Sequence, residues 1–185
     1  RRSRTAEEAD EWVAIRPGSD ALLLAAMCTV LVAESLVDVG PHVAEYLNGL
    51  DEFAAAIAPF TPESVVAATG VTAEAIRTLA RELAAATTAS VYGRIGTTTT
   101  EFGSTATWLI DALNILTGNL DRPGGAMFAM PVAGGATTRG KRGSGRGFAI
   151  GRGATRVSGH PEVMGEYPVG ALAEEITTPG EGQLR

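Results

Sequence analysis

The longest apolar run of the chain extends from residue 21 to residue 33 and is interrupted only by Thr29. It is too short to cross a bilayer, which takes about 20 residues. Ser19 or Asp20 is a favourable N-cap for a helix that begins at Ala21 and continues to about Val37. Because such a helix is apolar on nearly all sides, most of its surface has to be buried against the rest of the chain.

The composition bounds the kinds of site that the chain can hold. Its 185 residues are 45% apolar, which excludes wholesale disorder and fits one domain, or one lobe of a larger one. Aromatic residues make up only 5%, so the core consists mainly of small aliphatic side chains, which suits helix–sheet packing. A single cysteine and two histidines exclude a disulfide framework, a multi-cysteine zinc or iron–sulfur site and a histidine-rich metal centre within this chain.

Local signals along the first two thirds of the chain alternate between helices and short strands. Thr61-Pro62-Glu63 and Thr72 are typical of helix starts, and Gly70 ends the helix between them. Helix, strand, polar loop, helix is the order of a parallel α/β sheet. We therefore expect an α/β fold with a partial Rossmann-like parallel sheet flanked by helices. The expected helices are 41–48, 50–58, 62–70, 73–83, 104–116 (with Trp108, Leu109 and Leu113 on its buried side) and 172–176, and the expected strands are 11–15 and 89–92.

The composition changes after Asp121. Residues 122–161 contain no Asp or Glu and many Gly and Arg residues, so an irregular, basic segment is expected to follow the sheet. We place the boundary so that residues 1–128 form part of a dinucleotide-binding α/β domain, and 129–185 form the basic loop and the start of the next segment. The stretch 139–156 is either a surface loop or a loop that docks on an anionic cofactor; it could also contact nucleic acid, but the net charge of −6 counts against that.

Three groups of residues are candidates for ligand binding. The loop Gly93-Arg94-Ile95-Gly96-Thr97 follows an expected strand, and ligands of open α/β sheets bind at the ends of strands. A flexible Gly/Thr loop that binds no ligand would have the same sequence pattern. Asp20 either caps its helix or accepts hydrogen bonds from a guanine, whose N1–H and amino group lie side by side. Arg1, Arg2 and Ser3 suit a phosphate or ribose, or are solvated charge at the end of the chain.

No catalytic constellation is recognisable. Cys28 lies among apolar neighbours and reads as a structural thiol, and His42 and His160 have no partner at the spacing of a hydrolase triad. From the residues alone, the chain is a domain that could hold an anionic dinucleotide. A nicotinamide-binding Rossmann-type dehydrogenase domain remains an alternative, against which the missing GxGxxG argues. A non-catalytic module that binds a nucleotide or nucleic acid is another.

Several segments together resemble a known family. They are Arg1-Arg2-Ser3-Arg4-Thr5-Ala6, Arg16-Pro17-Gly18-Ser19-Asp20-Ala21-Leu22, Tyr92-Gly93-Arg94-Ile95-Gly96 and Asn114 to Gly125 with its Leu-Thr-Gly-Asn core. In this order they are similar to the molybdopterin oxidoreductases, molybdenum or tungsten enzymes that include formate dehydrogenases and dimethyl sulfoxide reductases. The resemblance covers residues 1 to about 128.

The resemblance implies a role for each candidate group. Asp20 would hold the guanine of a molybdopterin guanine dinucleotide, and Arg1, Arg2 and Ser3 would lie near its ribose or phosphates. The pterin end would be lined by Arg94, Ile95, Gly96 and Thr99. The cofactor would carry molybdenum or tungsten and support two-electron chemistry.

The resemblance also implies that the chain is an interior part of a longer oxidoreductase, inactive alone. The metal ligand and any iron–sulfur cluster would lie upstream of this segment and would not be bound by it. The expected partners are the remainder of the parent chain, an electron-transfer subunit or domain and a small-molecule substrate, with no nucleic acid and no membrane segment in this part. The compartment stays open, with the cytoplasm favoured.

Overall fold

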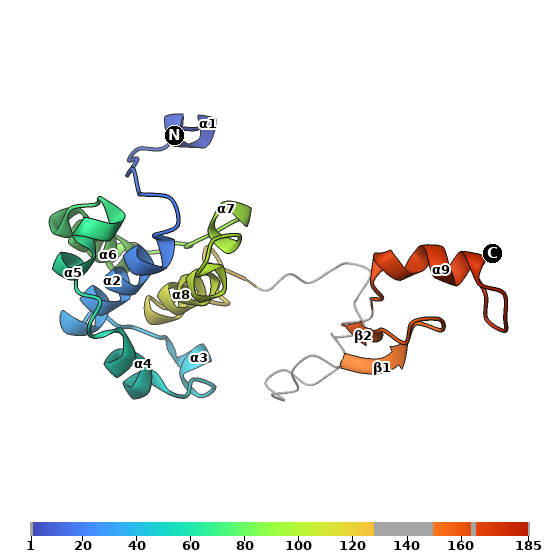
Figure 1. Ribbon diagram of the computed structural model, residues 1–185. Helices are drawn as coiled ribbons and strands as arrows, with labels where there is room; N and C mark the ends of the chain where they lie inside the picture. Colours follow the sequence, from blue (N-terminus) through green and yellow to red (C-terminus); the bar gives the residue numbers. More distant parts are fainter. Residues whose placement is uncertain (1, 128–149, 164–165, 185) are drawn as a thin grey trace. The chain divides into compact units, whose positions relative to one another are not determined.

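The computed structural model describes residues 2–127, 150–163 and 166–184 (Figure 1). The chain divides into two compact units between residues 128 and 129. We refer to residues 2–127 as the helical unit, and to 150–163 with 166–184 as the C-terminal unit. Arg1 and the part of the basic stretch before residue 150 lie outside the described residues.

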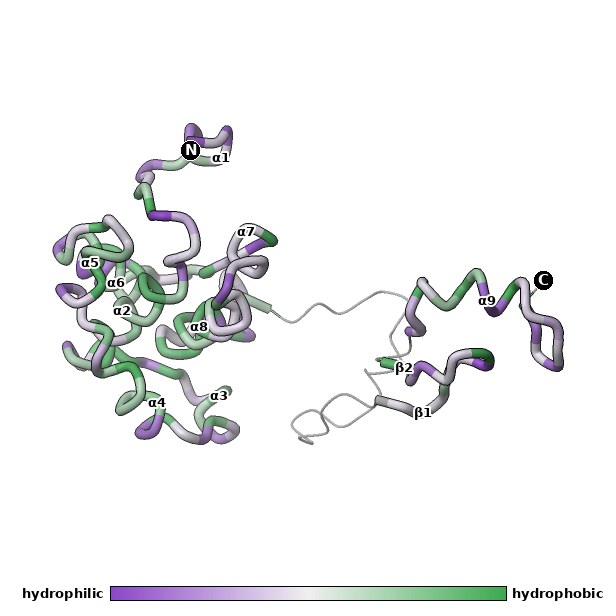
Figure 2. Tube along the Cα trace, viewed as in Figure 1, coloured by the Kyte–Doolittle hydropathy of each residue, from purple (hydrophilic) through white to green (hydrophobic). Residues whose placement is uncertain are grey.

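The helical unit is built around one helix, α2 (Asp20–Ala33). Every residue from Ala25 to Leu31 is buried, and Figure 2 shows α2 as largely apolar along its length. The prediction of a buried helix is therefore confirmed. Four helices pack against it: α4 (Leu50–Ile57), α5 (Pro62–Thr69), α6 (Ala73–Ala85) and α8 (Gly103–Leu116).

Short-range signals fix most of the helix ends. The hydroxyls of Thr61 and Thr72 each accept a backbone N–H three residues on, at 3.2 Å, and Gly70 ends α5 in the left-handed conformation. In contrast, α2 ends at Ala33 rather than near Val37. Ser35 takes a φ of 57°, and the N–H of Leu36 donates to the carbonyl of Leu31 at 2.8 Å, which closes the helix in a Schellman motif.

The remaining helices of this unit are single turns: α1 (Arg4–Glu7), α3 (Pro41–Ala44) and α7 (Ile95–Thr98). The helix expected over 41–48 forms only at α3. Trp108 is also placed differently from the expectation, because it is 56% exposed rather than buried on α8. Its indole packs edge-on against Phe53 of α4, with ring centroids 5.3 Å apart, so α4 covers only one side of it.

The described residues contain no parallel sheet. The segments expected as strands, 11–15 and 89–92, are neither helical nor paired with another strand. A strand requires the backbone of a neighbouring strand, and the described part of the helical unit provides none. Val13, Ile15 and Val91 nevertheless pack against the core of α2.

The C-terminal unit contains the sheet that the structure does describe. Strands β1 (Ile150–Ala154) and β2 (Pro161–Val163) pair antiparallel with an irregularity in register. A 3-10 turn, η1 (Val169–Ala171), leads into α9 (Leu172–Thr177), which confirms the helix expected over 172–176. Among the helices described, none has the length and apolar character needed to span a membrane.

Candidate functional site

Asp20 is the first residue of α2, yet its side chain does not cap the helix. The preceding residue, Ser19, occupies the N-cap position, and its hydroxyl donates to the carbonyl of Arg16 at 2.7 Å. Asp20 is half-buried, and its carboxylate has no hydrogen-bond or ion-pair partner among the described residues. The helix dipole stabilises its negative charge, and the carboxylate oxygens remain available to accept hydrogen bonds from a ligand.

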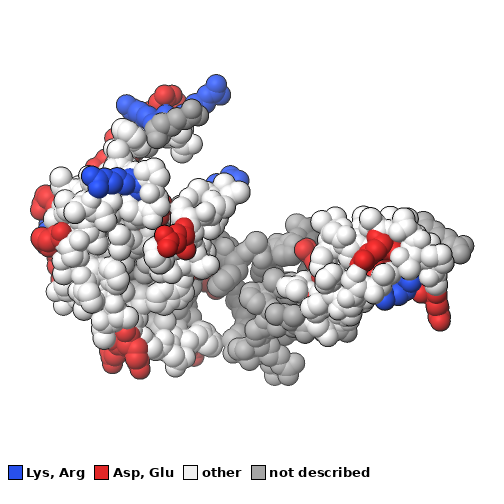
Figure 3. Space-filling model, viewed as in Figure 1, with Lys and Arg blue, Asp and Glu red and all other residues white. Residues whose placement is uncertain are grey.

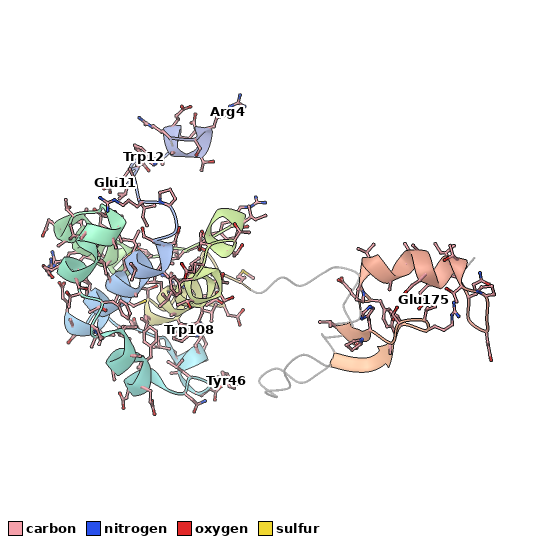
Figure 4. The ribbon with its side chains drawn as sticks, viewed as in Figure 1. Arg4, Glu11, Trp12, Tyr46, Trp108 and Glu175 are labelled. Atoms are coloured by element: carbon pink, nitrogen blue, oxygen red, sulfur yellow. The ribbon has the colours of Figure 1, made fainter. Side chains whose placement is uncertain are left out.

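An apolar hollow of about 490 Å³ opens beside this end of α2. Gly18, Ser19 and Leu22 line it from α2 and the preceding turn, while Phe102, Thr105 and Trp108 line it from α8 and the residue before it. Trp108 is labelled in Figure 4. The first turns of α2 and α8 therefore face the same hollow.

The predicted pterin loop forms a single turn of helix with open surroundings. Arg94 precedes α7, and its carbonyl accepts the N–H groups of Thr97 and Thr98 at 2.8 and 3.2 Å. The hydroxyl of Thr99 donates to the carbonyl of Ile95 at 2.7 Å, and Ile95 is 74% exposed. No atom approaches the place where a Cβ at Gly96 would lie, so this side of the turn is accessible to a ligand.

Close packing joins this loop to α8. At Gly103, the first residue of α8, the carbonyl oxygen of Thr98 occupies the place that a Cβ would need. Since the start of α8 also lines the hollow at the start of α2, the structure brings the first turn of α2, which begins with Asp20, and the loop 94–99 to the same end of the helical unit; the Asp20 side chain itself does not line the hollow. Figure 1 shows α7 and the start of α2 at this end, and Figure 3 shows blue Arg side chains on the body of the unit there.

The N-terminal cluster is placed apart from these residues. The hydroxyl of Ser3 accepts the N–H of Ala6 at 3.3 Å and so caps α1, while Arg2 is exposed. In Figure 1, α1 stands away from the other helices, on the segment whose Glu11 and Trp12 are labelled in Figure 4. The structure therefore does not bring Arg2 and Ser3 together with Asp20.

Two buried amides were not among the predicted site residues. Asn114 and Asn119 are each only 1% exposed, and both hydrogen-bond to the segment that leads into the loop 94–99. The sequence does carry a signal for Asn114. Asn114 follows the apolar Leu113 on a helix whose other buried positions are mostly aliphatic, and a buried amide has to find hydrogen-bond partners.

Of the cysteine and the histidines, Cys28 is inaccessible and the His42 imidazole is bonded, whereas His160 is exposed. Burial raises the pKa of the Cys28 thiol to about 12, which keeps it protonated and unreactive. The Nε2 of His42 bonds to the carbonyl of Leu120 at 2.7 Å. Across the described residues, no group of three or more His, Cys, Asp or Glu side chains is arranged to hold a metal ion.

Comparison with known proteins decides the family. The family model described as molybdopterin oxidoreductase matches residues 1–183. The chain belongs to the molybdopterin oxidoreductase family. This confirms the resemblance inferred from the segments around Arg1, Asp20, Arg94 and Asn114.

Individual relatives agree with this assignment. The chain is 40% identical over 127 residues to the thiosulfate reductase molybdopterin-containing subunit PhsA of Salmonella typhimurium, covering 64% of this chain and 16% of that protein. It is 37% identical over 123 residues to formate dehydrogenase H of Escherichia coli, covering 66% and 17%. Among solved structures, acetylene hydratase from Pelobacter acetylenicus is similar with a TM-score of 0.59 and 29% identity, covering 64% of this chain and 16% of that one. The chain thus spans about a sixth of the length of these relatives.

Proposed function

We propose that this chain is part of a larger molybdopterin-dependent oxidoreductase, in which it binds the guanine end of a molybdopterin guanine dinucleotide. The free, half-buried carboxylate of Asp20 at the start of α2 carries the proposal. Guanine presents an N1–H and an amino group side by side, and one carboxylate accepts from both. A carboxylate already engaged in capping its helix would not be available in this way.

The choice of cofactor binding over substrate binding is supported by the relatives. Their names refer to thiosulfate, formate and acetylene, which are chemically unlike substrates. A segment shared by such proteins is suited to what they have in common, the molybdopterin cofactor. When bound, the cofactor with its molybdenum or tungsten supplies two-electron chemistry, while this chain binds and orients its organic part.

The other candidate residues take the roles that the resemblance implies. Arg94, Ile95, Gly96 and Thr99 line the pterin end, and their exposure on α7 leaves that face accessible. The guanidinium of Arg94 has no partner among the described residues and is free to meet an anion. The cluster Arg1, Arg2 and Ser3 reaches the ribose or phosphates once the rest of the parent chain holds α1 in place.

The Rossmann-like parallel sheet belongs to the parent in this proposal. Ala89 and Val91 hydrogen-bond toward α8, whereas the backbone groups of Ser90 and Tyr92 make no hydrogen bond with any described residue. Alternate residues of a strand face opposite edges, so this segment has one satisfied edge and one open edge. A strand from the remainder of the parent chain completes the sheet at residues 89–92 and 11–15. Residues 1–128 then belong to the dinucleotide-binding domain, and 129–185 begin the next segment.

The remaining partners of the parent enzyme lie outside this chain. We place the metal ligand and any iron–sulfur cluster in other segments of the parent, as the resemblance implies, and the buried, protonated Cys28 is consistent with this. An electron-transfer subunit or domain and a small-molecule substrate complete the proposed reaction.

The test is an Asp20→Asn substitution in the full-length parent enzyme, with Asp51→Asn as the matched control. Asp51 is an exposed carboxylate in the first turn of another helix, α4. Losing a charged hydrogen-bond acceptor removes about 1.5–3 kcal/mol of binding, so guanine nucleotide retained by the Asp20→Asn enzyme should fall roughly 10-fold to 100-fold. The Asp51→Asn enzyme should retain it. Equal retention in both variants would contradict the role of Asp20.

A further inference from the structure

The segment between α6 and α7 is attached to α8 and the turn after it by a series of contacts at alternate residues. Thr87, Ala89, Val91 and Gly93 each meet a residue of α8 or of the following turn. As the segment advances toward α7, its contacts move back toward the start of α8. The partners, in the same order, are Arg122, Asn119, Asn114 and Ile110.

Asn114 makes the central contact of this series. Its Oδ1 accepts the N–H of Val91 at 2.9 Å, and its Nδ2 donates to the carbonyl of Val91 at 2.9 Å. Nδ2 also donates to the carbonyl of Ile110, one turn earlier on α8, at 3.0 Å. The side chain thus pairs with Val91 as a neighbouring strand would, and it is itself held by its own helix.

Asn119 extends the same arrangement beyond the end of α8. Its Oδ1 accepts the N–H of Ala89 at 3.0 Å, and its Nδ2 donates to the hydroxyl of Thr117 at 2.9 Å. Its backbone N–H donates to the carbonyl of Asn114 at 2.8 Å, so the two amides are linked. Arg122 adds an outer contact, in which Nη2 donates to the carbonyl of Thr87 at 3.2 Å.

The series leads directly into the loop 94–99. A side chain at Gly93 would collide with the Cδ1 methyl of Ile110, so the backbone lies against α8 immediately before the loop begins. At the other end of the loop, the carbonyl of Thr98 lies against Gly103 of α8. The backbone at both ends of the loop is therefore fixed with respect to one helix, while every residue of the loop except the half-buried Thr97 is exposed.

We propose that Asn114 and Asn119 are positioning residues, which fix the loop 94–99 on α8 at the place where it meets the pterin end of the cofactor. The identity of the ligand, the pterin end of the cofactor, rests on the proposed function. The contacts by which the two amides fix the loop do not depend on it. The two amides are 1% exposed and bond to the segment before the loop, so they act through Val91 and Ala89. Loss of Asn114 frees the start of the loop while leaving the packing of α2 with α5 and α6 in place.

The experiment uses the full-length parent protein with Asn114→Leu, which removes all three side-chain hydrogen bonds, and Asn114→Asp, which keeps only an acceptor for the N–H of Val91. The matched control is Thr29→Val. Thr29 is also buried, and its hydroxyl donates to the carbonyls of Ala25 and Ile57 at 3.0 and 2.9 Å, far along the chain from the loop. Two quantities are measured: amide hydrogen exchange at Thr97, Thr98 and Thr99 in cofactor-free protein, and the rate of pterin release from loaded protein.

In Asn114→Leu, exchange at the three threonine amides should rise about tenfold or more over Thr29→Val, and pterin release should accelerate by a similar factor, with Asn114→Asp in between. Exchange at these amides equal to that of the control would overturn the proposal. Faster exchange with unchanged pterin release would keep the positioning role and contradict the pterin contact instead. If Asn114→Leu does not fold, Asn119→Ala removes the acceptor of the Ala89 N–H, and unchanged exchange at Ala89 and in the loop would equally overturn the proposal.

Discussion

The helical unit buries an apolar core, while the C-terminal unit buries mainly polar side chains. Around α2, residues such as Leu31, Ile76 and Leu113 are completely buried against one another. In the described part of the C-terminal unit, Ala171 is the one buried apolar side chain. The others buried there are Thr155, Glu162 and Glu175.

A charged network takes the place of an apolar core in the C-terminal unit. The Nε of Arg156 lies 3.3 Å from Oε2 of Glu175, and its Nη2 donates to the carbonyl of Thr178 at 2.8 Å. The second oxygen of Glu175 accepts the N–H of Val157 at 2.9 Å. From this difference we expect the two units to be destabilised by different substitutions. The helical unit should be sensitive to the truncation of buried apolar side chains, and the C-terminal unit to the removal of a charge.

The largest effect is expected from Leu31→Ala. Leu31 is fully buried in α2, and truncating it leaves a cavity that costs about 2–5 kcal/mol of unfolding free energy. The chain has two tryptophans, Trp12 and Trp108, and both lie in the helical unit, so denaturation followed by tryptophan fluorescence reports on that unit. Val169→Ala, at a site 83% exposed, is the control and should leave the midpoint unchanged. If the Leu31→Ala midpoint equals that of the control, burial of apolar side chains around α2 does not stabilise the helical unit, and the contrast between the two units fails.

An intermediate effect is expected from Glu175→Gln. Glu175 is 8% exposed, and neutralising it weakens its bonds to Arg156 and Val157 by about 1–3 kcal/mol. Amide exchange at Val157 should accelerate, while the tryptophan-monitored transition of the helical unit stays the same. Glu181→Gln, at an exposed position of the same unit, should leave exchange at Val157 unchanged. If both glutamate variants behave alike, the network does not hold this unit together.

The smallest effect concerns acid pH and the surface of the helical unit. A hydrogen bond from Arg81 lowers the pKa of Glu34, and one from Arg77 lowers that of Glu63. Because these folded-state pKa values are depressed, the stabilisation is present above the unfolded pKa of glutamate and is lost as the pH falls through the folded one. Both pairs are exposed, so the loss should be small.

The check compares urea midpoints of the chain at about pH 7 and about pH 3 with those of a double variant, Arg77→Gln with Arg81→Gln. The difference between the two proteins should be present at neutral pH and vanish in acid. A difference that persists at low pH would show that these arginines act through packing rather than through their ion pairs.

The parts of the fold that depend on neighbouring residues could be predicted from the sequence. The caps at Thr61 and Thr72 and the stop at Gly70 act over a few residues, and the apolar run of α2 demands burial whatever surrounds it. The end of α2 was missed because serine rarely adopts the left-handed conformation found at Ser35. The exposure of Trp108 and the unpaired segment 89–92 depend on which elements are present to cover them, which periodicity does not specify.

In the candidate site, too, the features that depend on neighbouring residues could be predicted, and those that depend on distant contacts could not. Asp20 and the loop around Arg94 could be singled out by residue type and by position after a turn. Whether Asp20 caps its helix depends on the hydroxyl of Ser19, which turns to the carbonyl of Arg16 and leaves the position uncapped. The amides of Asn114 and Asn119 reach Val91 and Ala89 across more than twenty residues of sequence. Pairings of this range follow from the fold and not from a local pattern.

The most direct test of the account is to identify the nucleotide released by acid from the pterin cofactor of the purified full-length parent enzyme. If Asp20 accepts the paired donors of a purine, the nucleotide released will be guanylate, in a constant ratio to pterin. A pterin without a nucleotide, a nucleotide that lacks two adjacent donors, or a parent enzyme that contains no pterin would contradict the assignment.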